Sequence, residues 1–169
     1  MDDSDYEPLL PVEVADVPGD YQGKTVVKSG QINKTFDAQY SAQAQDISIS
    51  KLPLEPILRE VITDELDLKA ALESMEEVTF TMPYTGKLLE HGKEVILTLK
   101  PADLLLTVPV ADQEKVVSVK FKEASFGSYY ATAKGEELFL AFSVEEIKVD
   151  GEEVPLKSEI SYLIGGFKK

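Results

Sequence analysis

The feature of this sequence that most constrains its fold is the regular alternation of apolar and polar residues in short segments. These segments recur about every 8–12 residues between Tyr21 and Phe167, and turn-forming residues such as Gly and Pro separate them. Because successive side chains of a strand point to opposite faces of a sheet, a period of two indicates half-buried β-strands. We therefore expect a mainly β chain, either an antiparallel β-barrel or a curled β-sandwich of about 8–10 strands.

The expected strands cover residues 21–29, 34–50, 78–82, 84–90, 94–99, 103–108, 116–122, 126–132, 137–149, 153–156 and 158–167. In the 34–50 run the alternation changes phase near Asp46, which predicts a bulge or a bend. Pro83 is expected to end a strand, since proline cannot donate a hydrogen bond to a neighbouring strand. Asp150–Gly151 is the strongest hairpin signal in the chain.

One helical excursion interrupts the strands, over about residues 54–75. Apolar residues follow the 3.6-residue period of a helix here, namely Leu54, Ile57, Leu58, Val61, Ile62, Leu68, Leu72 and Met75. Pro56 suits a first helical turn, and either Asp64 or Asp67 could cap a second helix, so one kinked helix and two short helices are both consistent with the pattern. The apolar face must pack on the sheet, where it either plugs one end of a barrel or covers a sheet edge, and we favour the plug.

The charge of the chain is uneven. The net charge is −14, and residues 1–20 hold seven acidic side chains and no basic one. This composition predicts an acidic, flexible N-terminal tether over residues 1–19, followed by a single β-rich domain over residues 20–169. The acidity argues against a nucleic-acid partner, and no apolar stretch approaches the roughly 20 residues of a transmembrane helix.

The residues that usually perform catalysis or bind metals are scarce. The chain has no cysteine, which excludes disulfides, thiolate catalysis and cysteine-based metal sites. His91 is the only histidine, and Gly92 beside it predicts an exposed hairpin turn. Residues 126–128 (Phe-Gly-Ser) do not form a nucleophile elbow, and no glycine-rich phosphate loop is present. We therefore predict no catalytic residue, no metal site and no cofactor.

Carboxylates are numerous, and four adjacent pairs stand out: Glu76–Glu77, Glu136–Glu137, Glu145–Glu146 and Glu152–Glu153. Adjacent residues of a strand point to opposite faces, so these pairs do not converge on one substrate as glycosidase carboxylates do. Residues 150–153 are acidic enough to attract calcium, but they lack the spacing of a calcium loop.

Aromatic side chains gather late in the chain, at Phe126, Tyr129, Tyr130, Tyr162 and Phe167. Such residues can hold a sugar or an apolar ligand on a sheet, and core packing explains them equally well. The ligand-binding residues therefore stay unassigned.

Several short motifs, in order, resemble a known family. They are G-D-Y-Q-G-K (19–24), I-S-I-S-K-L-P-L (47–54), Y-T-G-K (84–87), L-T-L-K-P-A-D-L (97–104) and I-K-V-D-G (147–151). The chain from about 19 to 167 is similar to a family of Bacteroidetes secreted lipoproteins of unknown function, in the style of calycin-like and lipocalin-like β-barrels. The shared motifs are turns and carry no active residue.

The resemblance implies a location for the protein. Mature chains of such lipoproteins begin with a lipidated cysteine and an acidic stretch, so a lipid anchor directly before Asp2 is expected, with Met1 in the place of that cysteine. The expected location is the outer membrane or cell surface; if Met1 is the genuine start, it is the cytoplasm.

The function expected from these observations is that of a non-enzymatic cell-envelope lipoprotein domain. It would be a binding or accessory module whose partner is an unknown envelope protein or a small ligand. The alternative is a calycin-like carrier of a small apolar ligand, as eight-stranded barrels can be. A carboxylate-dependent hydrolase is the remote alternative.

Overall fold

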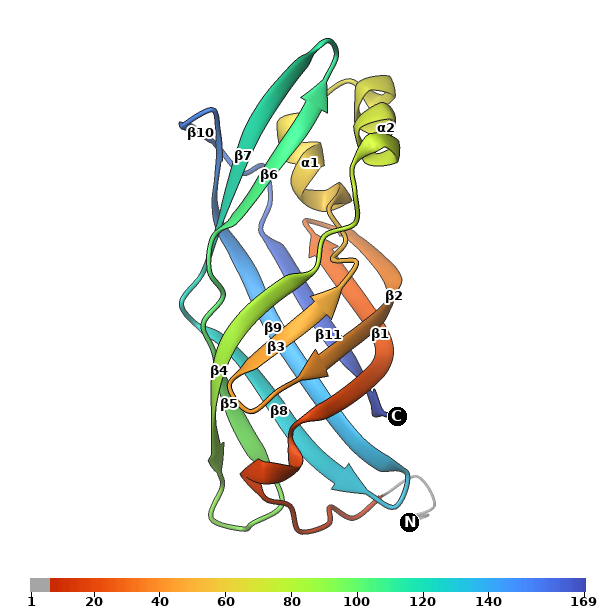
Figure 1. Ribbon diagram of the computed structural model, residues 1–169, viewed down its shortest axis with the longest axis vertical. Coiled ribbons are helices and arrows are strands. Elements are labelled where there is room, and N and C mark those ends of the chain that lie inside the picture. The colour runs from red at the N-terminus through yellow and green to blue at the C-terminus, as the bar shows by residue number, and fades with distance from the viewer. Residues whose placement is uncertain (1–6) are drawn as a thin grey trace.

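The computed structural model describes residues 7–169, and the first six residues of the predicted tether lie outside this range. The structure is mainly β, as the sequence predicts, with one antiparallel sheet of eleven strands and two short helices (Figure 1). The strands are β1 (Gly19–Ser29), β2 (Ile32–Ala42), β3 (Asp46–Ser50), β4 (Phe80–Leu88), β5 (Val95–Leu99), β6 (Leu104–Val110), β7 (Gln113–Phe121), β8 (Ser125–Thr132), β9 (Gly135–Val149), β10 (Glu152–Val154) and β11 (Ile160–Lys168). The two helices are α1 (Glu55–Val61) and α2 (Glu65–Ser74), and a 3₁₀ turn, η1 (Val14–Asp16), precedes β1.

Eight of the strands close into a barrel. The pairing runs β1-β2-β3-β4-β5-β8-β9-β11, and β11 returns to pair with β1. The barrel alternative of the sequence prediction is therefore the observed one. The structure has eleven strands, and three of them, β6, β7 and the three-residue β10, lie outside the barrel.

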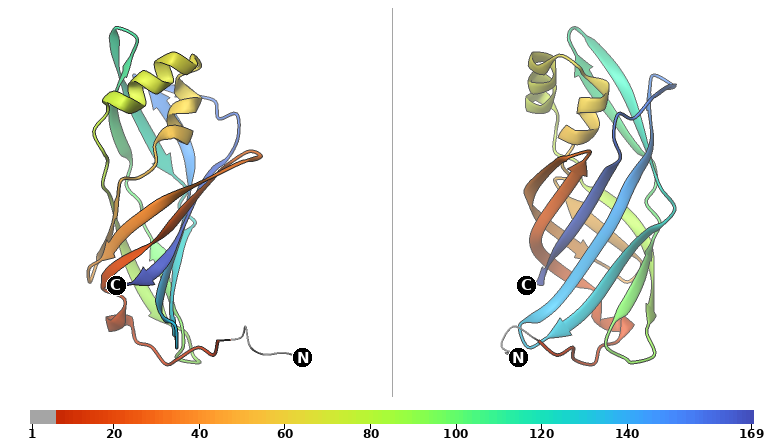
Figure 2. Two further views of the ribbon diagram at one scale, coloured as in Figure 1. Left: turned by 90° about the vertical axis from the view of Figure 1, so that its right-hand side faces the viewer. Right: turned by 180° about the vertical axis from the view of Figure 1, so that it is seen from behind.

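Three excursions leave the barrel at the same end. The α1–α2 segment connects β3 to β4, the β6–β7 hairpin connects β5 to β8, and β10 lies between β9 and β11. Neighbouring barrel strands are antiparallel, so every second connection falls at the same end of the barrel. We call this end the insertion end; Figures 1 and 2 show it at the top, opposite η1 and the first described residues.

Strand β9 joins the barrel to the sheet of the insertion end. Its first part pairs with β8 and β11, whereas its last residues pair with β7 and β10. Between Lys120 and Phe121 the register against β9 shifts, so that Glu145 has no pairing partner on β7. This bulge accounts for the change of phase between Phe142 and Ile147 that the sequence contains.

The helical excursion consists of two helices, the second of the two possibilities left open by the sequence. Asp64 is the N-cap of α2, and its side chain accepts a hydrogen bond from the Asp67 N–H. Ile57 and Leu58 of α1 are fully buried in the common hydrophobic core, and α2 packs beside β6. Both helices lie over the insertion end (Figure 2), where we expected a plug.

Side chains fill the barrel interior. Tyr21 stacks on Tyr40 with ring centroids 5.4 Å apart, and Phe142 stacks on Tyr162 at 5.1 Å. The Tyr21 hydroxyl donates to the Val17 carbonyl and the Tyr162 hydroxyl to the Pro53 carbonyl, each at 2.6 Å. These bonds satisfy the polar ends of the buried rings, which would otherwise be costly to bury.

Three details differ from the sequence prediction. The 34–50 run is not one bent strand, because the chain reverses between β2 and β3, where Gln43 N–H donates to the Asp46 carbonyl. Pro83 does not end a strand but lies inside β4, where the pairing of that strand passes from β3 to β5. Its missing N–H therefore interrupts neither ladder.

The third difference concerns the tether expected over residues 1–19. In the structure, residues 7–18 lie against the barrel. Leu10 bridges to Ala131, Val12 N–H donates to the Gly92 carbonyl, and Val17 is fully buried. The apolar residues Leu10, Val12 and Val17 outweigh the acidic composition, because each finds a place on the barrel surface or in its core.

No helix within residues 7–169 combines the length and the apolar character needed to cross a membrane.

Candidate functional site

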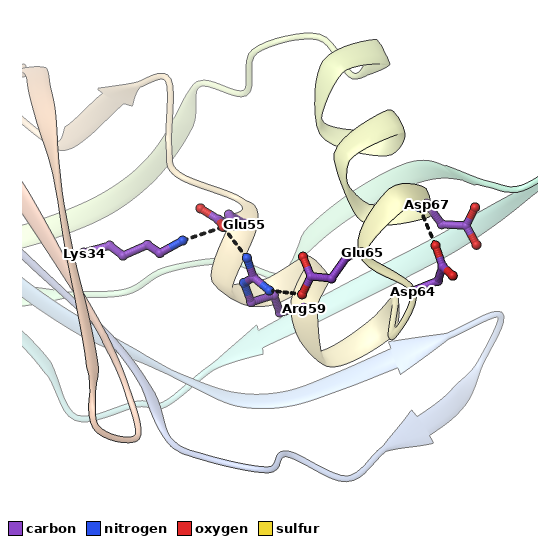
Figure 3. A network of polar contacts seen from close by, with 6 residues as sticks. All are labelled: Lys34, Glu55, Arg59, Asp64, Glu65 and Asp67. Carbon is purple, nitrogen blue, oxygen red and sulfur yellow. Dashed lines mark hydrogen bonds and ion pairs between the residues drawn. The ribbon is translucent and has the colours of Figure 1, made fainter.

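A chain of ion pairs ties the helices to the barrel at the insertion end (Figure 3). Lys34 Nζ on β2 donates to Glu55 Oε1 at 2.6 Å, and the same oxygen accepts from Arg59 Nη2 at 2.8 Å. Arg59 Nη1 donates to Glu65 Oε1 of α2 at 2.7 Å. Glu55 and Arg59 are one helical turn apart on α1, so both point to the same side of that helix.

The electrostatics of this network are those of a paired structural cluster. The Lys34 ammonium, with a smaller contribution from Arg59, holds the pKa of the Glu55 carboxyl below its usual range. Each carboxylate of the network has a cationic partner. A carboxylate held in its charged form by two cations is a poor proton donor at neutral pH, so the network positions the helices and does not suit general acid catalysis.

A groove of about 470 Å³ lies between the two helices. Leu68 and Leu72 contribute apolar surface to it, and charged side chains of both helices surround them. Leu66, which also lines the groove, is 79% exposed. The lining residues are Glu55, Arg59, Glu65, Leu66, Leu68, Lys69, Leu72 and Glu73.

The most exposed large apolar side chains lie at the insertion end. The four most exposed large apolar side chains of residues 7–169 are Leu66 (79%), Leu105 (70%), Ile32 (57%) and Val116 (51%). They come from α2, from the β6–β7 hairpin and from the start of β2 next to α1, all of which lie at the insertion end (Figure 1). Exposed apolar side chains of this size are candidates for contact with a partner.

A second polar cluster lies at the opposite end of the barrel, around Lys168. Its ammonium donates to Glu136 Oε1 at 3.0 Å and to the Asp16 carbonyl, and it lies 5.8 Å and 5.6 Å from the ring centroids of Tyr21 and Tyr129. The Tyr129 hydroxyl also donates to Glu136. The cluster fixes η1 over this end of the barrel.

The pKa values in this cluster follow from burial and hydrogen bonding. Burial, and then the hydrogen bond to Glu136, raise the pKa of the Tyr129 hydroxyl. The hydrogen bond from Tyr129, followed by the bond from Lys168, lowers the pKa of the Glu136 carboxyl. Every one of these groups has a partner within the chain, so the cluster is satisfied without a ligand.

The paired glutamates that are adjacent in the sequence do not converge on a common site. Glu136 reaches Tyr129 and Lys168, whereas the next residue, Glu137, points to the other face of β9. The remaining pairs are single surface charges: Glu77 lies 3.6 Å from Lys51, Glu145 lies 3.6 Å from Lys120 and Glu146 lies 3.7 Å from Lys148, while Glu152 and Glu153 are exposed on β10. Among the described residues, no three His, Asp or Glu side chains are grouped so that they could hold a metal ion.

The other residues singled out in the sequence are also dispersed. His91 is exposed in the turn after β4, where its Nδ1 accepts the Lys93 N–H at 3.0 Å. Tyr129 and Tyr162 belong to the interior, whereas Phe126 and Phe167 are 49% and 42% exposed on the outside. The aromatic residues therefore form no common ligand platform.

Sequence reasoning missed Arg59 and Lys168, the cations at the centres of the two clusters. Arg59 did carry a signal, because it is the only arginine of the chain and follows Glu55 by four residues. Lys168 carried none, since its partners Asp16 and Glu136 are distant in sequence.

Comparison with known proteins gives one match. The family described as "Domain of unknown function (DUF4840)" covers residues 16–149, which include the last residue of η1 and the chain from β1 through β9. No curated protein and no solved structure matches the chain. Because the match spans most of the barrel and the whole helical excursion, the chain belongs to the DUF4840 family, whose function is unknown.

Proposed function

We propose that this chain is a non-enzymatic binding module of the cell envelope. It is held at the outer membrane or cell surface by a lipid anchor that precedes Asp2, and its insertion end contacts a partner protein.

The observation that carries the proposal is the position of the most exposed apolar side chains relative to the N-terminal segment. Ile32, Leu66, Leu105 and Val116 belong to elements of the insertion end. These elements and the first described residues lie at opposite ends of the barrel (Figures 1 and 2). A chain anchored through its N-terminus would present this surface away from the membrane, where a partner can reach it. The resemblance to secreted lipoproteins gives independent support.

The filled interior supports a surface role over the carrier alternative. Five buried tyrosines, Tyr21, Tyr40, Tyr84, Tyr129 and Tyr162, belong to the core, and each donates its hydroxyl to an acceptor within the chain. A small apolar ligand would have to displace these rings and break their hydrogen bonds, at a cost of about 1–3 kcal/mol for each bond left unmade. Native mass spectrometry of protein purified from its source is expected to give the mass of the polypeptide without a retained apolar ligand.

The anchor is tested on the gene as it occurs naturally. We expect the codons upstream of Asp2 to encode a signal peptide that ends in a cysteine. Cells that express this full reading frame should incorporate an alkyne-labelled fatty acid into the protein, and replacement of that cysteine by alanine should abolish the labelling. Surface protease treatment of intact cells should then digest the wild-type protein.

Two results would overturn the proposal. One is a natural reading frame that starts at Met1 with no lipid incorporated, which would indicate the cytoplasm. The other is a hydrolytic activity that is lost on replacement of Glu136 or another of the paired carboxylates.

A further inference from the structure

Strand β6 is an edge strand of the insertion-end sheet. It pairs with β7 along its whole length, and no other described strand pairs with its second side. Edge strands present unpaired N–H and C=O groups that can bind another extended chain, and most proteins cover or charge such edges. Only the backbone groups of β6 that point away from β7 could bind such a chain.

The bonds of Val116 on β7 show this orientation. Val116 N–H donates to Asp150 Oδ1 at 2.9 Å, and its carbonyl accepts the Asp150 N–H at 2.8 Å. Both groups of Val116 therefore face away from β6, so its pair with Thr107 is of the non-hydrogen-bonded kind. The N–H and C=O of Thr107 consequently point to the free side of β6.

The same alternation extends along the strand. Leu105 and Pro109 lie two residues from Thr107 on either side, so their backbone groups also point outward. Pro109 fits this position, because the N–H that it lacks would face solvent rather than β7. The free edge thus offers the N–H and C=O of both Leu105 and Thr107 at the spacing that a neighbouring strand requires.

A groove of about 490 Å³ runs along this edge. It is lined by Leu105, Leu106 and Thr107, consecutive residues whose side chains point to opposite faces of the sheet. A hollow that touches all three lies beside the edge and not over one face. Residues 74–78, which lead from α2 towards β4, form its other wall.

The charge of the groove indicates the kind of chain that fits. Glu76, Glu77 and Glu114 line it and are exposed, and its lining residues include no Lys or Arg. Of the three, Glu77 lies 3.6 Å from Lys51, which is outside the groove lining. A second copy of this chain would bring the same glutamates, and a net charge of −14, against them. Positively charged side chains would instead be attracted to this edge.

We propose that the free edge of β6 binds an extended segment of a partner protein that carries lysine or arginine, and that this segment adds to the sheet as a further strand. The main-chain groups of Leu105 and Thr107 supply the hydrogen bonds, and the exposed Leu105 side chain supplies apolar contact. Glu76 and Glu114 favour a basic partner most, because Glu77 already lies 3.6 Å from Lys51. This inference deepens the proposed binding role and rests on it.

The test uses a fluorescent heptapeptide of alternating valine and threonine with a lysine at each end. We expect it to bind the wild-type protein, with chemical-shift changes centred on residues 105–107 and an affinity that falls as salt is added. Thr107→Pro removes the outward N–H but no bond to β7, and should weaken binding at least about tenfold. Thr107→Val is the matched control, because it keeps the backbone donor and should bind like the wild type.

Two further peptides test the chemistry. A peptide with alternate backbone amides N-methylated, and one with glutamates in place of the lysines, should each bind at least about tenfold more weakly. Equal binding by either peptide, equal binding by Thr107→Pro, or no binding of the lysine peptide at millimolar concentration would overturn the inference. Self-association that Thr107→Pro abolishes would also overturn it, since the occupant would then be a second copy.

Peptide binding does not depend on a lipid anchor, so the two proposals fail separately. Absent fatty-acid labelling with intact peptide binding would refute the anchor alone. Labelling without peptide binding would refute the basic partner strand alone.

Discussion

At the scale of single residues, closure of the barrel depends on Gly23 and Gly166, which face each other where β1 pairs with β11. A Cβ atom added at Gly23 would lie 1.9 Å from the Gly165 carbonyl oxygen, and one added at Gly166 would lie 2.3 Å from the Gln22 carbonyl oxygen. These neighbours are backbone atoms, which cannot rotate aside as a side chain can. Any larger residue must therefore push the two strands apart.

We expect Gly23→Ala to lower the free energy of unfolding by about 3 kcal/mol or more, since overpacking at backbone contacts is among the costly kinds of substitution. The matched control is Gly165→Ala, whose added Cβ would meet Phe139 Cδ2 at an ordinary 3.8 Å. It should change stability by less than about 1 kcal/mol. Urea denaturation measures both, and equal stability of the two variants would show that the β1–β11 seam is not tightly closed.

The residues of the candidate site could be predicted only in part, because their roles arise from distant neighbours. The exposure of His91 followed from Gly92 beside it, and the separation of Glu136 from Glu137 followed from strand geometry. The outward backbone of Thr107 could not be found in this way, since it is defined by the bonds of Val116 to Asp150.

At the scale of elements, the N-cap residue Asp64 sets the start of α2. Asp64 Oδ1 accepts the Asp67 N–H at 2.9 Å (Figure 3), which satisfies one of the free donors at the start of the helix. α2 forms one wall of the groove between the helices and packs beside β6. The stability of this cap therefore bears directly on the shape of the insertion end.

Replacement of the cap tests this role. Asp64→Ala should reduce stability by about 1 kcal/mol, as N-cap losses usually do. Asp64→Asn keeps the acceptor and removes only the charge, so it should recover most of the loss. Hydrogen exchange should show faster exchange in α2 for Asp64→Ala than for Asp64→Asn, and identical behaviour of the two would assign the effect to charge.

The alternation of apolar and polar residues predicted most strands, because it reflects burial of one face and can be recognised within a short stretch of sequence. It failed where a reversal has no turn residue: residues 43–45 are Gln-Ala-Gln, and the phase change near Asp46 resulted from a turn. It failed again at Pro83, where a strand changes partners and needs no donor. The pairing of β5 with β8 could not be predicted either, because the β6–β7 hairpin separates these strands in the sequence and the alternation within a strand does not depend on its partner.

At the scale of the whole molecule, the tyrosines in the barrel make the fold sensitive to alkali. Burial raises the pKa of Tyr21, Tyr40, Tyr129 and Tyr162 above the ordinary value of 10.0. Their neutral forms are thus favoured in the folded state, whereas the unfolded chain ionises near pH 10. The resulting stability is fully present below pH 10 and is lost as the pH rises from there towards the folded pKa values.

We expect cooperative unfolding between about pH 10 and pH 12, because each buried tyrosine costs about 1.4 kcal/mol per pH unit in this window and a domain has about 5–15 kcal/mol in total. Circular dichroism and the ultraviolet absorbance of tyrosinate should change together. Tyr162→Phe removes one titrating group along with its bond to Pro53, so it should be less stable at pH 7 and lose stability less steeply above pH 10. Tyrosinate absorbance that rises near pH 10 while the β-sheet signal persists would contradict this prediction, because it would mean that water reaches these rings. An interior open to water would favour the carrier alternative, which needs space inside the barrel.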